Sequence, residues 1–319
     1  MTIEVVTWQQ LVERAGSQDR ARTLLRIGVW RRVVRNAYVE GFLDDSPLVR
    51  LAALRAVLPD GAALSHRTAL WVLGCDVLTG SLDVTVPRGR RVAARPGLRI
   101  HIAALPDSEL VEYHGVLLTS AARAVVDVAR TEPLAEAVAF GDAALRCGAT
   151  TPLAIEASLE TAGALRGVRA AVRAVPLLNG RSQSPMESRL RIALHLGGVP
   201  DKDVQHDVYD DGGHAGRTDL HVEGVAVEYD GRASRLGRAP FTDDRRRQNR
   251  ICDTAMEVRR FTSRDYYGCH PRQLGAVVLR AVRIACTRDR SRLRSGPDTL
   301  PKPRLRPLPT RAERAAASV

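Results

Sequence analysis

Long hydrophobic runs, lysines and aromatic residues are all scarce in this chain of 319 residues. No run approaches the roughly 18 apolar residues that a membrane-spanning helix needs. No charged and then apolar segment at the N-terminus resembles a secretion signal. These absences argue against a membrane partner and predict a cytoplasmic protein. Aromatic residues make up 4% of the chain, and no platform for stacking single-stranded bases is evident, which argues only weakly against an RNA substrate.

Cysteine is too sparse and too widely spaced to organise the fold. The number of cysteines is five, which is odd, and no two are arranged as a CxxC pair. A disulfide framework and a cysteine metal knuckle are therefore both excluded as expectations. We expect reduced thiols at all five positions, Cys75, Cys147, Cys252, Cys269 and Cys286. Of these, Cys252, Cys269 and Cys286 are expected to be inert packing groups.

Positive charge is abundant, and it is almost entirely arginine, because Lys202 and Lys302 are the only lysines. The net charge of +12 and a pI near 10.3 indicate a polyanionic partner, most commonly nucleic acid. Residues 287–319 alone carry +6, half of the whole excess. We therefore expect a disordered basic tail over residues 287–319 that follows a folded part of only mildly basic character.

Helix and turn signals predict a winged helix-turn-helix over residues 1–45. Thr7 and Gln10 match a capping box, and apolar residues recur at helical spacing after them. A second helix is expected near residues 21–28, and residues 29–39 read as two short strands around a turn. The predicted DNA-binding side chains are Arg20, Arg22, Arg26, Arg31 and Arg32. The alternative is a small helical cap with a structural hairpin and solvated arginines.

Residues 46–180 have a mixed pattern that predicts an α+β middle region without a chemical motif. Helices are expected at residues 48–58 and 64–73, and half-buried strands at 82–86 and 98–102. Residues 116–120 lead from a strand into a capped helix, and further Ala/Leu-rich helices reach residue 178. This region is expected to bridge or orient the two ends of the chain.

Residues 181–286 show the order of an αβββαβ domain. Ser184, Pro185 and Glu187 form a helix start, with a serine cap, proline at the first position and glutamate three residues after the cap. Three strands are expected within residues 204–229, then a turn, a charged helix over 242–255 and a strand over 257–261.

Strand alternation places three carboxylates together in this domain. Along residues 225–230 the valines and the tyrosine share one face, whereas Glu228 and Asp230 share the other. Asp219 on the preceding strand can face the same side. Carboxylates at a strand end suit a hard divalent ion such as Mg²⁺, and like charges placed together favour a bound cation. Such an ion activates water and stabilises charge on a phosphodiester.

Structural alternatives exist for each of these residues. Glu187 could simply complete the capping box. Asp219 and Asp230 could form salt bridges with nearby arginines, namely Arg217, Arg245 and Arg247. Four histidines of this region are expected to be surface or strand residues rather than metal ligands; they are His195, His206, His214 and His221.

The same residues carry a resemblance to a known family. Glu187 in a capped helix and the segments 217–220, 227–231, 244–249 and 259–262 resemble the very-short-patch-repair-endonuclease-like domain of the PD-(D/E)XK superfamily. The N-terminal helices and residues 65–69 and 116–130 are similar to AbiEi-type antitoxins. The resemblance covers most of the chain except the tail.

The resemblance implies roles for particular residues. Asp219 would bind the metal, Glu228 would be the second carboxylate, and Glu187 the acid on the helix. Asp230 stands where the superfamily commonly has lysine. The following helix would support the site through Asp244, Arg247 and Asn249. Relatives usually have a histidine two or three residues after Asp-Gly, where this chain has Ala233 and Ser234, which puts activity in doubt.

Two functions follow as hypotheses. The first is a DNA-binding protein whose restriction-endonuclease-like domain hydrolyses DNA with Mg²⁺ or Mn²⁺. The second is an AbiEi-like antitoxin or transcriptional regulator in which the nuclease fold is degenerate, with a toxin-type or self-association partner. An RNA-directed nuclease is a third alternative.

Overall fold

The computed structural model describes residues 3–59, 61–75, 80–89, 97–163, 165–231, 249–254 and 256–288. The chain is a mixed α/β protein, as predicted. It divides into two compact units, one comprising Met1–Val128 with Ala157–Ala162, and one comprising Ala129–Glu156 with Gly163–Val319. No helix among the described residues combines the length and the apolar character needed to cross a membrane.

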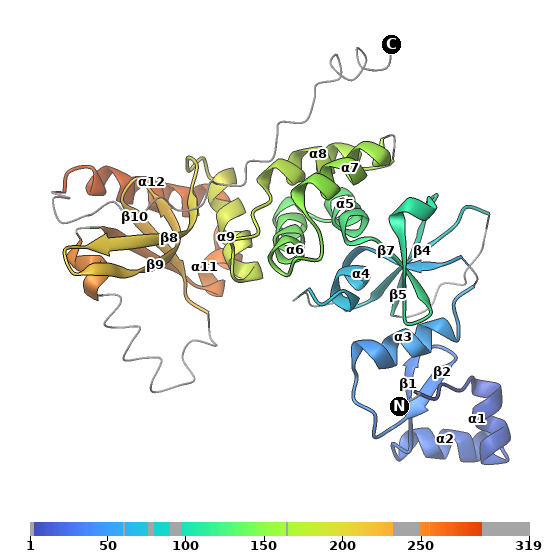
Figure 1. Cartoon of the computed structure of the whole chain (residues 1–319). Helices are drawn as coiled ribbons and strands as arrows, with labels where there is room; N and C mark the ends of the chain where they lie inside the picture. The colour runs from blue at the N-terminus through green and yellow to red at the C-terminus, as the bar shows by residue number, and fades with distance from the viewer. Residues whose placement is uncertain are drawn as a thin grey trace, which may run out of the picture. The chain divides into compact units, whose positions relative to one another are not determined.

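The first unit begins with two short helices and a hairpin (Figure 1). The elements are α1 (Trp8–Ala15), α2 (Gln18–Arg26), β1 (Trp30–Val34) and β2 (Ala37–Glu40). The Thr7 capping box is present, so the predicted helix start is confirmed. The hairpin turn places Asn36 at a φ of 69°, a conformation that asparagine adopts more readily than most residues. Leu11, Ala21 and Trp30 are buried in the common core of these elements.

The rest of the first unit is built on a five-stranded sheet in the order β5-β4-β3-β7-β6. The predicted strands at residues 82–86 and 98–102 are confirmed as β4 and β5. Their pairing is parallel, whereas β6 and β7 form an antiparallel hairpin. The remaining elements are α3 (Pro47–Arg55), β3 (Ala63–Leu64), α4 (His66–Val72), β4 (Leu82–Val86), β5 (Leu98–Ile102), η1 (Asp107–Glu109), β6 (Leu110–Tyr113), β7 (Val116–Thr119) and α5 (Ala121–Thr131).

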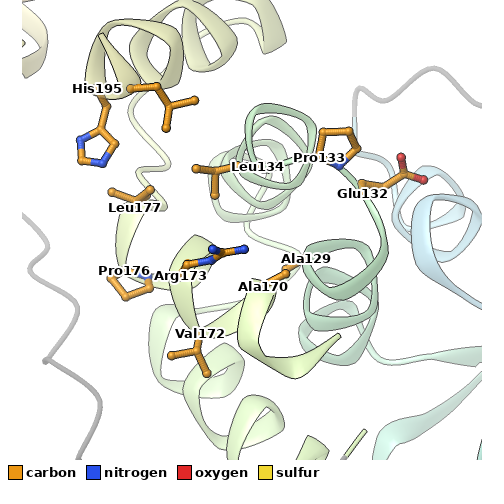
Figure 2. A pocket seen from close by; sticks show the side chains of 11 residues that line it. Ala129, Glu132, Pro133, Leu134, Ala170, Val172, Arg173, Pro176, Leu177 and His195 are labelled. Atoms are coloured by element: carbon orange, nitrogen blue, oxygen red, sulfur yellow. The ribbon is translucent and has the colours of Figure 1, made fainter. Parts of the chain in front are cut away.

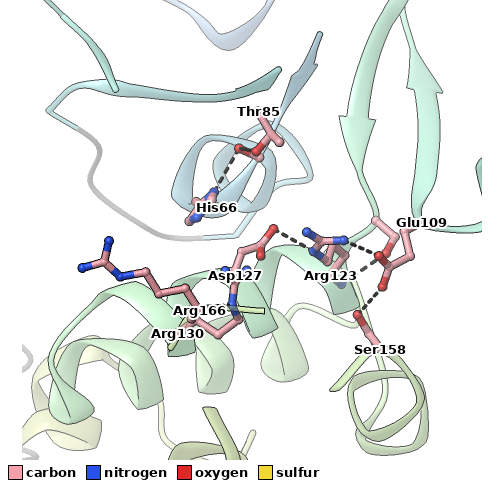
Figure 3. Close-up of polar contacts among 10 residues, drawn as sticks. His66, Thr85, Glu109, Arg123, Asp127, Arg130, Ser158 and Arg166 are labelled. Carbon is pink, nitrogen blue, oxygen red and sulfur yellow. Dashed lines mark hydrogen bonds and ion pairs between the residues drawn. The ribbon is translucent and has the colours of Figure 1, made fainter. Parts of the chain in front are cut away.

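A buried ion network ties α5 to the neighbouring segments of this unit (Figure 3). Arg123 is 2% exposed, and its Nε donates to Asp127 Oδ2 at 2.9 Å while its Nη1 contacts Glu109. Glu109 also accepts a 2.7 Å hydrogen bond from Ser158 Oγ. Burial opposes the charge on Arg123, but Asp127 and Glu109 outweigh it and raise its pKa. Each buried charge in this network therefore depends on the others.

The second unit includes helices that sequence reasoning placed in the middle region. They are α6 (Leu134–Arg146), the first turns of α7 (Pro152–Ala162), α8 (Val168–Ala174) and η2 (Val175–Leu177). Asp142 of α6 is fully buried and accepts hydrogen bonds from Arg191 Nη2 and Ser188 Oγ, both at 2.7 Å. Since those partners lie on α9 (Pro185–Leu196), α6 belongs with the C-terminal unit. The predicted boundary at residue 180 does not coincide with the boundary between the compact units.

A four-stranded sheet with the order β11-β10-β9-β8 forms the centre of the C-terminal region. Its three consecutive strands are antiparallel, and β11 returns parallel to β10. Residues 249–253 are helical, and they lie within the helix predicted over residues 242–255, just before the fourth strand. The elements are β8 (Asp203–Asp210), β9 (Gly213–Val222), β10 (Val225–Tyr229), β11 (Glu257–Phe261), α11 (Ser263–Gly268) and α12 (Pro271–Ala285). The last two helices were not predicted.

Helices α9 and α12 cover one face of this sheet (Figure 1). Leu190 and Leu194 of α9 and Val278 of α12 share a core with Leu220 and Val227 of the sheet. The two helices approach backbone to backbone at two glycines, Gly197 and Gly275. A Cβ on either one would overlap the main chain of the other segment. Glycine is required here by space, not by φ.

Candidate functional site

The face of the sheet away from α9 and α12 carries the candidate site. Val225 and Val227 are in the core beneath the helices, whereas Ala226 packs with Ile251 and Met256 on the opposite side. Side chains alternate along a strand, so Glu228 shares the face of Ala226. The predicted alternation along this strand is therefore confirmed.

Four polar side chains occupy corresponding positions on the four strands. Leu220 of β9 pairs with one residue on β8 and one on β10. Continued by one residue, the same register brings Glu228 of β10 level with Asp219, and Gln205 of β8 lies at the corresponding backbone position with its side chain turned to Glu187 of α9. Glu228 in turn pairs with Arg260 of β11. We call these four residues, Gln205, Asp219, Glu228 and Arg260, the polar row.

Asp219 is held in place by the neighbouring strand. Its Oδ2 accepts a 2.8 Å hydrogen bond from the backbone N–H of Tyr229. Arg217, a predicted alternative partner of Asp219, donates from Nε to Asp207 Oδ1 at 2.8 Å. That bond, together with one from His214, lowers the pKa of Asp207, with Arg217 as the larger cause. The Tyr229 bond orients the Asp219 carboxylate at the end of β10.

Glu228 is 8% exposed and bonded to an arginine. Arg260 Nε donates to its Oε2 at 3.0 Å, and the Arg260 side chain is 40% exposed. The backbone N–H of Asp230 donates to Phe261 O at 2.8 Å, which continues the parallel pairing past the strand end. Asp230 therefore lies just past the end of β10, two residues after Glu228.

Glu187 has a structural role at the start of α9. Ser184 Oγ accepts from Glu187 N at 3.2 Å, so the predicted serine cap is confirmed. The Glu187 carboxylate accepts from Gln183 N at 2.8 Å, one residue before the cap, and from Gln205 Nε2 at 2.9 Å. Glu187 thus links the helix start to the polar row through Gln205, a residue that sequence reasoning missed because glutamine carries no distinctive motif signal.

The three predicted carboxylates do not form a tight triad. In the described part of the chain, the one group of three metal-ligand side chains whose ligand atoms all lie within 4.8 Å of one another is Asp203, His206 and His221. Asp203 was not predicted as a ligand, and both histidines were interpreted as surface or strand residues. The signal was present only in three dimensions, because Asp203 and His221 pair across strands.

The predicted supporting residues lie mostly outside the described residues. Asp244 and Arg247 fall there, as do Ala233 and Ser234 and residues 289–319 of the tail. Asn249 is described, and it is an exposed residue in a helical segment.

The predicted DNA-binding arginines differ in exposure and in their partners. Arg20, Arg26 and Arg32 are exposed, and among the described residues no acidic side chain forms an ion pair with them. Arg22 pairs with Asp19 at 2.9 Å on the exposed side of α2. Arg31, in contrast, donates to the backbone carbonyls of Leu43 and Asp44. Arg31 therefore holds the segment that follows the hairpin against β1.

A mainly apolar pocket of about 630 Å³ lies in the second unit between α6, α8 and the end of α9 (Figure 2). Its polar lining side chains are Glu132, Arg173 and His195. Burial lowers the pKa of His195, and the positive charges of Lys202 and Arg191 lower it further. The lining combines opposite charges with leucine and proline side chains.

Comparison with known proteins gives relatives but no family. No protein-family model matches the chain. It is 28% identical over 213 residues to the uncharacterized proteins MT2308 and Rv2248 of two Mycobacterium tuberculosis strains, covering 66% of this chain and 78% of theirs. The crystal structure of the RV2827C protein from the same species is a distant neighbour, with 18% identity and a TM-score of 0.39 over 58% of this chain and 74% of that chain.

Proposed function

We propose that this chain is a DNA-binding protein whose C-terminal unit hydrolyses DNA phosphodiester bonds in a Mg²⁺- or Mn²⁺-dependent reaction. The observation that carries the proposal is the polar row. It sets Asp219 and Glu228 level with each other on adjacent strands, with the Arg260 guanidinium beside them. The element order of a helix, three antiparallel strands and a parallel fourth strand agrees with the PD-(D/E)XK nuclease resemblance.

The donor set fits a hard divalent ion. Asp219 and Glu228 supply carboxylate oxygens, which Mg²⁺ and Mn²⁺ prefer. Neighbouring carboxylates repel one another, and a cation between them removes that cost. A bound Mg²⁺ would activate water and neutralise charge on a phosphate oxygen.

The remaining residues act on the substrate or on the carboxylates. Arg260, being exposed on one side, can donate to a phosphate oxygen as negative charge develops on it. Asp230 at the strand end is placed to accept a proton from an attacking water or to orient it. The Tyr229 N–H fixes Asp219, and Glu187 fixes Gln205, so the row is positioned before DNA arrives.

The N-terminal unit would hold the duplex. Helix α2 followed by the hairpin has the order of a winged helix-turn-helix, and Arg20, Arg26 and Arg32 are exposed on it. Arginine–phosphate contacts of this kind supply affinity that depends strongly on salt.

The test is a plasmid-nicking assay of the full chain with Mg²⁺ or Mn²⁺. We expect cleavage by the wild type and loss in Asp219→Asn and Glu228→Gln. Asp207→Asn is the matched control, because Asp207 is a carboxylate of the same sheet outside the polar row and paired with Arg217. Equal cleavage by all four proteins would mean a contaminating nuclease and would refute the proposal.

A second candidate is a DNA-binding regulator of the antitoxin type with an inactive nuclease fold. The exposed arginines of the first unit favour it, as does Ala233-Ser234 in place of the usual histidine. Sequence-specific binding to DNA upstream of the chain's own gene, with no cleavage of DNA or RNA under any metal condition, would support this function and exclude the first.

A further inference from the structure

Three ligand side chains converge on the sheet face beside the polar row. Asp203 Oδ2 lies 3.8 Å from His206 Nδ1 and 3.7 Å from His221 Nδ1. The two imidazole rings are stacked, with centroids 4.2 Å apart. We propose that Asp203, His206 and His221 bind a divalent transition-metal ion of the Zn²⁺ class, at a site separate from the carboxylates of the polar row.

An unusual backbone conformation creates this group. Asp203 and His206 are three residues apart on β8, so in a regular strand their side chains would lie on opposite faces. Gln205 between them has a φ of 54°, a left-handed conformation that is uncommon for a residue other than glycine. The local reversal of the strand brings His206 to the side of His221. Strained residues of this kind concentrate at functional sites.

The ligand types select the ion. Two imidazoles with one carboxylate suit Zn²⁺ and its neighbours in the first transition row, whereas Mg²⁺ prefers oxygen ligands alone. Tetrahedral Zn²⁺ with bonds of about 2.0–2.1 Å separates its ligand atoms by roughly 3.3 Å. The observed carboxylate–imidazole separations of 3.7 and 3.8 Å therefore need to close by about half an ångström, and the imidazole–imidazole separation, which is within 4.8 Å, by up to about 1.5 Å. Three protein ligands leave a fourth position for water.

The site is open enough for an ion to enter. The three side chains are between 21% and 32% exposed. Ala226 pairs with His221 on the neighbouring strand. The stacked rings must splay for both Nδ1 lone pairs to point at one ion, and exposed side chains can make such a movement.

Binding of the metal ion must break one hydrogen bond of His221, and the loss of that bond can be detected at its donor. Gly224 N donates to His221 Nε2 at 3.0 Å, so the neutral ring carries its proton on Nδ1. An ion bound at Nδ1 moves that proton to Nε2, where it would oppose the Gly224 N–H. Losing one such bond weakens binding by about fivefold. Glu223 and Gly224 form the turn between β9 and β10, and an adjustment there would relieve the contact.

The proposed site does not depend on the nuclease proposal. His221 is two residues from Asp219 on β9 and shares its face, which corresponds to a distance of about 6–7 Å along the strand. A failure of DNA cleavage would leave the predicted Zn²⁺ binding unchanged, and a failure of Zn²⁺ binding would leave the carboxylates of the polar row intact.

The experiment is calorimetric titration of the chelator-stripped full chain with Zn²⁺, in a buffer with excess Mg²⁺. We expect one Zn²⁺ per chain that Mg²⁺ does not displace, and at least about a tenfold loss of affinity in His206→Gln and in His221→Gln. His214→Gln is the matched control. His214 lies on the same sheet 3.0 Å from Asp207, but among the described residues no second imidazole converges with that pair on a common point.

Unchanged Zn²⁺ affinity in both histidine variants would overturn the proposal and would point to binding by cysteine thiols. Variants that fail to fold do not leave the question open, because the wild-type chain has its own readout. In its NMR spectrum, Zn²⁺ must shift the ring signals of His206 and His221 and the amide signal of Gly224. If those signals stay in place at saturating Zn²⁺, the site does not exist.

Discussion

Arg260 Nε lies 3.0 Å from Glu228 Oε2, so the parallel pairing of β10 and β11 sets a guanidinium against the carboxylates of the polar row. Arg259, its neighbour on the strand, instead contacts Glu257. Two consecutive arginines therefore contact different carboxylates, one in the polar row and one outside it, and they provide a matched pair for mutagenesis.

Replacing Arg260 by methionine is expected to reduce metal-dependent DNA cleavage on the order of a hundredfold, because a donor to the developing phosphate charge is lost. The rate of plasmid nicking at saturating Mg²⁺ measures the effect. Arg259→Met should cleave at close to the wild-type rate. Similar rates for Arg260→Met and the wild type would show that Arg260 serves Glu228 alone.

Replacing Arg123 by methionine is expected to destabilise the first unit by about 3–5 kcal/mol, because two buried carboxylates lose their cation. Trp8, Trp30 and Trp71 all lie in that unit and are the only tryptophans, so fluorescence during urea unfolding reports on it alone. Arg22→Met removes an exposed ion pair and should cost less than about 1 kcal/mol. Equal losses in the two variants would contradict this account of the network.

Lys202 should titrate far below an ordinary lysine, because burial lowers its pKa to about 8, although Asp201 opposes the shift. Its Nζ donates to the carbonyls of Val199 and Pro200. With ¹³C-labelled lysine the chain gives two side-chain signals, from Lys202 and Lys302. We expect the Lys202 signal to titrate with a midpoint near 8. Two midpoints above 10 would rule the shift out.

The same shift has a consequence for stability. Between pH 8 and 10.5 the unfolded chain keeps the Lys202 proton that the folded chain has released, so stability rises with pH. This contribution is complete above pH 10.5 and is lost as the pH falls through about 8. Its slope is below about 1.4 kcal/mol per pH unit, and solvent around the partly exposed group reduces it further. Comparing the wild type with Lys202→Met over this range isolates it.

Removing Arg20 and Arg26 together should lower the slope of log K against log salt for duplex DNA by about two, one per phosphate contact. Fluorescence anisotropy at several salt concentrations measures that slope. Arg169→Ala, an exposed arginine of α8 in the other unit, should leave it unchanged. A slope insensitive to Arg20 and Arg26 would remove α2 from the DNA interface.

Local signals in the sequence predicted those features that depend on neighbouring residues. The caps at Thr7 and Ser184 and the facing of Ala226 and Glu228 follow from spacing and chemistry over a few positions. The attachment of α6 to α9 could not be predicted in this way, because it rests on Asp142 meeting Arg191, 49 residues away.

The contacts between polar groups on the sheet also depend on residues that are distant in the sequence or on the backbone conformation. The contact between Arg260 and Glu228 requires knowledge of which strands pair in parallel. The approach of His206 to Asp203 requires the positive φ of Gln205. The sequence does not predict this φ, because the residue is neither glycine nor asparagine. Side-chain alternation taken alone would separate those two residues.

The backbone contact between Gly197 and Gly275 constrains which residues two positions distant in the sequence can accept. Because a methyl group at either position would push α9 and α12 apart, neither glycine can drift independently of the other. Gly198 is under a different constraint, since its φ of 81° serves the turn that follows α9. Two adjacent glycines should therefore show different patterns of exchange among relatives: positions 197 and 275 should both stay glycine, and position 198 should accept asparagine.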